Sequence, residues 1–169
     1  MGVGSVMAKF EFNAGDEIAI QISRLADKQD EIAKKALYQA AKIVADKIKD
    51  NLKSLPEDKF RYLKENEQFK GVPESQKQDL IKHFGITPID VDNKGNWNVK
   101  IGFDGYGSYK TNKYPKGLPI PLLARAIESG SSVRKKTPFI RPALRSVKSK
   151  AEEAMAKVVD KETEKIMKK

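Results

Sequence analysis

Apolar residues recur at helical spacing through the first third of the chain. They lie three or four positions apart, with no Gly or Pro between them, and comprise Leu37, Ala40, Ala41, Val44, Ile48, Leu52 and Leu55. Such spacing places them on one face of an amphipathic helix. The pattern predicts a long helix over about residues 27–54, with Asp27 or Asp30 as its N-cap and Pro56 as its stop.

A shorter helix is expected after Pro73, because Pro suits the first turn of a helix. Its apolar side is expected to comprise Leu80, Ile81 and Phe84. Gly85 follows directly and is the expected C-cap.

Two more helices are expected in the last third of the chain. Residues 119–127 form a short apolar segment, and a long amphipathic segment covers about residues 138–168. One broad stripe along that segment carries six apolar residues and Glu162, namely Leu144, Val147, Ala151, Met155, Val158, Glu162 and Ile166. Pro138 and Pro142 stand at its beginning, where a missing N–H costs least.

A period of two, typical of strands, marks the middle of the chain. Ile89 and Val91 alternate with polar residues, and so do Trp97, Val99, Ile101 and Phe103. The polar turn 92–95 separates the two runs, so a β-hairpin with one buried face is predicted near residues 87–103. Residues 9–13 alternate more briefly and indicate a short strand or an extended arm. The apolar residues 18–25 leave helix and strand equally open.

These elements predict an α+β fold. A small antiparallel sheet, with the hairpin near 87–103, is expected to pack against a long N-terminal helix and a long C-terminal helix. The 169 residues suit a single domain. Within it we expect residues 1–7 to be a flexible leader, residues 56–85 a charged helical insertion, and residues 104–118 a mobile loop.

Composition narrows the classes of function. Only 39% of the residues are apolar and 33% are charged, and no apolar run is long enough to cross a membrane. The absence of Cys excludes disulfides and thiolate chemistry. The formal net charge is +10, but only six of the 33 basic residues are Arg. A Lys-rich surface favours a solvated face, and non-specific contact with DNA phosphates stays open.

The residues give no indication of catalysis. The single His, His83, is best explained as a cation at a helix C-terminus. Asp90 and Asp92 are typical strand-end and turn residues rather than metal ligands. Residues 102–107 and 129–132 contain Gly but match no phosphate-binding motif. We therefore expect no enzyme, no metal and no cofactor.

The predicted loop 104–118 mixes aromatic and basic residues. The aromatic ones are Tyr106, Tyr109 and Tyr114, and the basic ones are Lys110, Lys113 and Lys116. Such a mixture suits a plain surface loop, a protein interface, or a contact with nucleic acid. The sequence leaves these three interpretations open.

One extended motif covers residues 124–144. It reads Ala-Arg-Ala-Ile-Glu-Ser-Gly-Ser-Ser, a short basic spacer, then Thr-Pro-Phe-Ile-Arg-Pro-Ala-Leu. It resembles a signature of the tail-completion, or head–tail joining, family of long-tailed bacteriophages, the gene-product-ten type of lambda-like phages. The matching residues are Glu128, Gly130, Ser132, Pro138, Phe139, Arg141, Pro142, Ala143 and Leu144. Ser129 and Ser131 replace the usual Phe and Thr, and segment 56–85 lacks the Thr-Gly-x-Leu-Arg that members often carry after the first long helix.

Within the motif, Gly130 suits a sharp turn at a helix C-terminus, and Phe139 suits a buried anchor. Glu128 and Arg125 are expected to hold the turn to neighbouring basic groups. The motif is either a turn that positions two helices or a surface shared between subunits. The candidate motif or interface residues are Arg125, Glu128, Ser129, Gly130, Ser132, Pro138, Phe139, Arg141 and Pro142.

The resemblance implies a non-enzymatic virion protein, made in the cytoplasm of the bacterial host. It implies a subunit of a homo-oligomeric, six-fold ring that contacts the phage connector and the tail-tube proteins, with DNA passing through the ring. A ring needs two different complementary faces on each subunit. The alternative is a DNA-binding protein that acts without sequence preference through its basic surface.

Overall fold

The computed structural model describes residues 8–12, 18–22 and 30–167. In chain order the elements are β1 (Ala8–Phe12), β2 (Ile18–Ile22), α1 (Asp30–Lys53), α2 (Glu74–Lys82), β3 (Phe84–Ile86), β4 (Asp90–Val91), β5 (Trp97–Phe103), α3 (Ile120–Ser129) and α4 (Ile140–Met167). The predicted α+β class, with a long helix at each end of a small antiparallel sheet, is confirmed. The predicted leader 1–7 and the alternative cap Asp27 lie outside the described residues.

The sheet is antiparallel and has five strands, with β5 in its interior. One edge of β5 pairs with β2, which in turn pairs with β1. The other edge pairs with β4 at Trp97 and Asn98 and with β3 from Ile101 to Phe103. The pairing of β4 with β5 is the predicted hairpin. Asp92 closes its turn, because its Oδ1 accepts the backbone N–H groups of Lys94 and Asn96.

The end of the short second helix differs from the prediction. Helix α2 ends at Lys82 with His83 as its C-cap, so Gly85 is not the cap. Phe84 and Gly85 belong instead to β3, where they pair with Phe103 and Gly102. The ring of Phe84 lies 5.1 Å from that of Phe103. The local sequence of Phe84 and Gly85 fits the end of a helix. Their pairing with β5, which is distant in the chain, places them in a strand instead.

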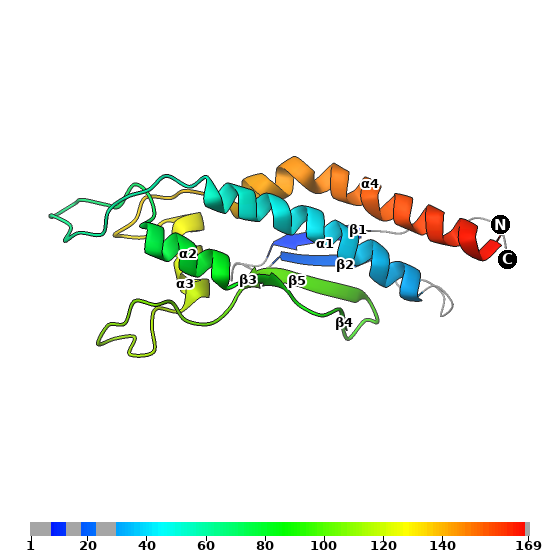
Figure 1. The fold of residues 1–169 in the computed structure, drawn as a ribbon, viewed down its shortest axis with the longest axis horizontal. Coiled ribbons are helices and arrows are strands. Elements are labelled where there is room, and N and C mark those ends of the chain that lie inside the picture. The colour runs from blue at the N-terminus through cyan, green and yellow to red at the C-terminus, as the bar shows by residue number, and fades with distance from the viewer. Residues whose placement is uncertain (1–7, 13–17, 23–29, 168–169) are drawn as a thin grey trace.

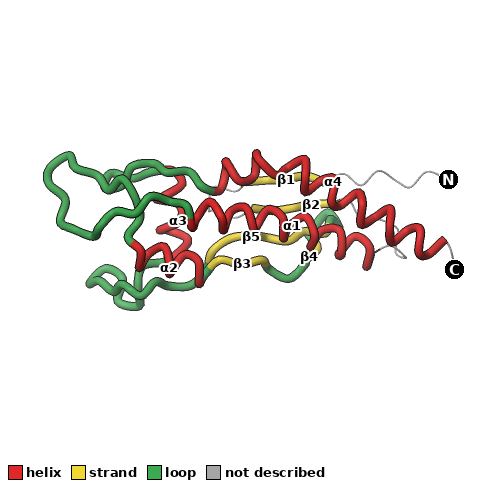
Figure 2. Tube along the Cα trace, turned by 45° about the horizontal axis from the view of Figure 1, so that its top comes forward, coloured by secondary structure: helices red, strands yellow, loops and turns green. Residues whose placement is uncertain are grey.

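The two long helices form one layer over the sheet. Helices α1 and α4 lie side by side along one face of it, and both views agree on this arrangement (Figures 1 and 2). They are antiparallel, since Lys35 near the start of α1 pairs with Glu162 near the end of α4 at 3.2 Å. At the opposite end the Asn51 side chain donates a hydrogen bond to the Phe139 carbonyl at 3.1 Å. Helices α2 and α3 lie at that same end (Figure 1).

The core lies between the helix layer and the sheet. All seven apolar positions predicted for the first long helix are buried, and so is the expected anchor Phe139. On β5 the side chains of Val99, Ile101 and Phe103 are buried, whereas Lys100 is exposed. The predicted alternation is therefore confirmed from Val99 to Phe103, whereas Trp97 is only half-buried and Val91, on the other arm of the hairpin, is exposed. Among the described helices, none is both long and apolar enough to cross a membrane.

Candidate functional site

Three irregular segments gather at the end of the molecule where α1 ends and α4 begins (Figure 1). They comprise residues 54–73, 104–119 and 130–139, and we call them together the loop pole. The only helical part of the expected insertion 56–85 is α2, and residues 56–73 contain no helix. The motif and the Tyr-rich loop, which are separate in the sequence, are therefore parts of one end of the structure.

The motif turn is organised around Glu128, which is completely buried. Its carboxylate accepts the backbone N–H groups of Phe139 at 2.7 Å and of Ile140 and Arg141 at 2.9 Å. These N–H groups begin α4, where a helix has no internal acceptors for them. Gly130 makes the turn possible with φ of 81°, and its N–H caps α3 through the Ala126 carbonyl at 2.8 Å.

The structure corrects the role expected for Glu128. This carboxylate caps the N-terminus of α4 and does not hold basic side chains, while Arg125 is exposed to solvent. The other candidate residues at the surface are Ser129, Ser132, Pro138, Arg141 and Pro142. The motif therefore has a structural part, formed by the buried Glu128 and Phe139 and the half-buried Gly130, and an exposed part.

Arg134, in the basic spacer of the motif, is a buried residue that the sequence reasoning missed. Its guanidinium donates hydrogen bonds to the Gly71 carbonyl and to Gln76 Oε1, both at 2.8 Å. It also lies over the ring of Phe69, 5.5 Å from the centroid. Burial lowers the pKa of this guanidinium. A signal was present, because Arg is rare in this Lys-rich chain and its planar fork suits buried carbonyls.

The backbone joins the same two segments. The Phe69 N–H donates to the Val133 carbonyl at 3.0 Å, and the Lys135 N–H donates to the Phe69 carbonyl at 2.8 Å. The side chain of Gln68 adds hydrogen bonds to the carbonyls of Ser131 and Ser132. Segment 54–73 is therefore fixed to the motif spacer along several residues.

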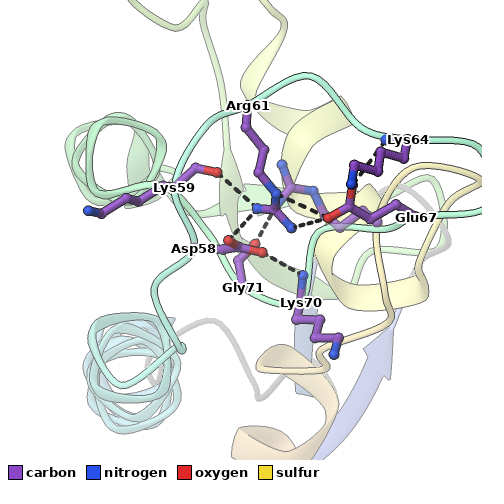
Figure 3. A network of polar contacts seen from close by, with 8 residues as sticks. Asp58, Lys59, Arg61, Lys64, Glu67, Lys70 and Gly71 are labelled. Atoms are coloured by element: carbon purple, nitrogen blue, oxygen red, sulfur yellow. Dashed lines mark hydrogen bonds and ion pairs between the residues drawn. The ribbon is translucent and has the colours of Figure 1, made fainter.

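A polar network gives segment 54–73 its own shape (Figure 3). Arg61 donates to Asp58 Oδ1 at 2.6 Å and to Glu67 Oε1 at 2.9 Å. The backbone N–H of Lys70 donates to Asp58 Oδ2, and that of Lys64 donates to Glu67 Oε2. The Lys70 N–H, and then Arg61, lower the pKa of Asp58. The Lys64 N–H, and then Arg61, lower the pKa of Glu67.

Segment 104–119 contains the predicted Tyr-rich loop. The N–H of Gly107 donates to the Leu118 carbonyl at 2.8 Å, and Ser108 bonds to Asp79 of α2. Tyr106 and Tyr109 are exposed, and Tyr114 is half-buried. The ring of Tyr109 lies 5.1 Å from that of Phe60, so the loop contacts segment 54–73. The mobility expected for this loop stays a prediction.

Two of the residues weighed for catalysis or metal binding, His83 and Asp92, have acidic or backbone neighbours that the structure identifies. His83 Nδ1 lies 3.8 Å from Asp104 Oδ1. Asp92 is occupied by its hairpin turn. In the part of the chain that the structure describes, no three His, Asp or Glu side chains lie close enough together to hold a metal ion.

Comparison with known proteins gave no relative. No protein-family model matches the chain, no curated protein matches it, and no solved structure matches it. The resemblance of residues 124–144 to a phage signature therefore stays a prediction from the sequence.

Proposed function

We propose that the protein is a structural virion subunit of a long-tailed bacteriophage, which completes the tail or joins it to the head without catalysis. The observation that carries the proposal is the geometry of the motif. Its residues Glu128, Gly130 and Phe139 set where α4 begins relative to α3. A motif that fixes how two helices are placed relative to each other suits a structural protein, which acts by offering binding surfaces to its partners.

A ring subunit needs two different faces that complement each other. The loop pole is one distinct surface, with exposed aromatic residues. The helix layer is another, and its exposed groove between α1 and α4 is lined by Lys35, Tyr38, Lys42 and Lys161 among others. In the proposed assembly these surfaces serve a six-fold ring and its contacts with the connector and the tail tube.

The first turns of α4 suggest a contact with passing DNA. Arg145, Lys148 and Lys150 are exposed there, and no acidic residue occurs between Ile140 and Ala151. No carboxylate of the same stretch of α4 neutralises these cations. They suit the phosphate backbone, which is recognised by charge alone.

The test of the virion role is a stop codon in the gene within its phage or prophage, followed by electron microscopy of the lysate. DNA-filled heads beside separate tails, or tails with aberrant ends, are the expected result. A copy of the gene supplied in trans is the control and should restore infectious particles. Normal infectious particles from the mutant would overturn the proposal.

The same cations favour the second candidate, a non-specific DNA-binding protein. It predicts that duplexes of unrelated sequence bind equally and that affinity falls steeply with salt. Changing Arg145, Lys148 and Lys150 to Ser should then reduce the slope of log affinity against log salt by roughly three. The matched control changes Lys157, Lys161 and Lys165 to Ser. Equal slopes for both triple variants would count against a contact at the start of α4.

A further inference from the structure

Among the large aromatic side chains that the loop pole exposes, Phe60 and Tyr109 are in contact, and Tyr62 lies two residues from Phe60 in the chain. The exposed fractions are 55% for Phe60, 102% for Tyr62 and 52% for Tyr109. We call these three residues the aromatic cap. A side chain as exposed as Tyr62 contributes nothing to the core, and clustered exposed aromatics are typical of interaction surfaces.

Ring contacts and ion pairs hold the aromatic cap in place. The ring of Phe60 lies 5.1 Å from that of Tyr109 and 5.8 Å from that of Phe69, which is buried. Arg61, the residue between Phe60 and Tyr62, is held by the Asp58 and Glu67 carboxylates. A surface that is already ordered loses little conformational entropy when it binds, which raises affinity.

Charge around the aromatic cap is unbalanced. The Asp58 and Glu67 carboxylates offset the charge of Arg61. The other exposed basic residues of segments 54–73 and 104–119 are Lys59, Lys64, Lys70, Lys110, Lys113 and Lys116. The exposed acidic residues there are fewer, namely Glu57, Glu65 and Asp104. Glu57 also lies 3.9 Å from Lys77 Nζ. The rim of the aromatic cap is therefore basic.

We infer that the aromatic cap and its basic rim dock a protein partner whose surface carries acidic residues around an apolar recess. Opposite charges at the rim steer and orient such a complex, and buried aromatic anchors supply most of its affinity. The inference does not depend on the virion role, because it rests on the chemistry of this surface alone.

Two other occupants fit the surface less well. Single-stranded nucleic acid binds best through several free ring faces in a row. Within the aromatic cap only Tyr62 is fully exposed, since the ring of Phe60 packs against two others, and the Asp58 and Glu67 carboxylates pair with Arg61, the residue between Phe60 and Tyr62. A second copy of this chain would bring like charges to the rim if it docked through its helix-layer groove, because Lys35, Lys42 and Lys161 line that groove.

The test is site-specific photo-crosslinking with the full chain in the cells that make it. Tyr62→p-benzoylphenylalanine carries the photoreactive group, and Val91→p-benzoylphenylalanine is the control, at an exposed apolar residue of β4. The expected result is an adduct at position 62, absent at position 91, to one protein through a peptide that mass spectrometry shows to be net acidic. Adding Lys110→Glu, Lys113→Glu and Lys116→Glu to the position 62 variant should reduce that adduct several-fold.

Circular dichroism and the melting temperature of the charge-reversed chain must match those of the parent, so that unfolding does not explain the loss. An adduct to nucleic acid, to a second copy of this chain, or to a neutral or basic peptide would overturn the inference. So would an adduct yield at position 62 no greater than at position 91, or one that the three Glu substitutions leave unchanged.

Discussion

Buried charged side chains determine the path of the loops at the loop pole. Glu128 accepts three backbone N–H groups at the start of α4, and Arg134 donates to Gly71 and Gln76 across the same end. Lys77 donates to the Leu55 carbonyl at 2.9 Å, just beyond the end of α1. A buried charge that loses its partners is costly, so each of these residues favours one arrangement of the segments around it.

Glu128→Ala should be strongly destabilising, because it leaves three N–H groups at the start of α4 without their acceptor. We expect the free energy of unfolding to fall by about 1–3 kcal/mol, measured by urea denaturation. Glu153→Ala, at an exposed site on the same helix, is the control and should change it by less than about 0.5 kcal/mol. Equal effects of the two substitutions would contradict the capping role.

Gly117→Ala should be more harmful than Gly95→Ala, although both glycines have positive φ. A Cβ at Gly117 would lie 2.1 Å from the Gly107 carbonyl oxygen, whereas none of the surrounding atoms comes within 4 Å of a Cβ at Gly95. The change at Gly95 should cost about 1–2 kcal/mol of unfolding free energy from backbone conformation alone. A smaller loss for Gly117→Ala would show that the loop accommodates the side chain.

At the scale of elements, the sequence predicts what is periodic and misses what depends on distant pairing. Helix α1 and strand β5 follow from local spacing, because each buries one face. Strand β3 was missed, since its three residues follow a helix directly and include a Gly that suits a helix end. The partners of Glu128 and Arg134 were also missed, because they lie 11 to 63 residues away along the chain.

The helix layer should resist enlargement of its small buried residues. Ala151 on α4 is fully buried, so Ala151→Leu must displace packed neighbours. We expect a loss of about 1–3 kcal/mol in unfolding free energy, measured by thermal or urea denaturation. Ala156→Leu makes the same change at an exposed position of α4 and should be nearly neutral. A neutral Ala151→Leu would mean that the core has room at this site.

The ordered shape of segment 54–73 should depend on pH. The pKa values of Asp58 and Glu67 are lowered from the ordinary 3.8 and 4.5, so both carboxylates stabilise the segment above that range. This contribution is lost as the pH falls through their lowered pKa values. Amide-exchange protection factors of residues 54–73 should therefore begin to fall as the pH drops below about 5 and should go on falling through the lowered pKa values of the two carboxylates.

Asp58→Asn is the matched variant for this experiment, because it keeps the size of the side chain and removes one of the two titrating groups. It should weaken the pH dependence of protection within residues 54–73 and leave that of α1 unchanged. An identical pH profile in the variant and the parent would show that the network does not order the segment.

The whole molecule is elongated, with the helix layer along its length and the loop pole at one end (Figure 1). Helix α4 has 28 residues and is therefore about 42 Å long. Arg134 and Phe69 connect the motif to segment 54–73, and Phe60 and Tyr109 connect that segment to 104–119. The pole is therefore a composite surface carried at the end of a rod.

Small-angle X-ray scattering of the isolated monomer should report this shape. A compact chain of 169 residues has a radius of gyration of about 15 Å. We expect a larger value, independent of protein concentration, because the long helices extend the molecule. A value at 15 Å would contradict the arrangement of α1 and α4, and a value that rises with concentration would indicate assembly.

The antiparallel pairing of α1 with α4 has a consequence for how the protein is made. Helix α1 leaves the ribosome long before α4, yet α4 is the neighbour that completes its layer. Until α4 is synthesised, the apolar side chains of α1 that it will bury remain exposed. They can then aggregate with other chains or bind chaperones. The nascent chain must therefore stay soluble while the residues between α1 and α4 are synthesised. The many charged residues of α1 favour that solubility.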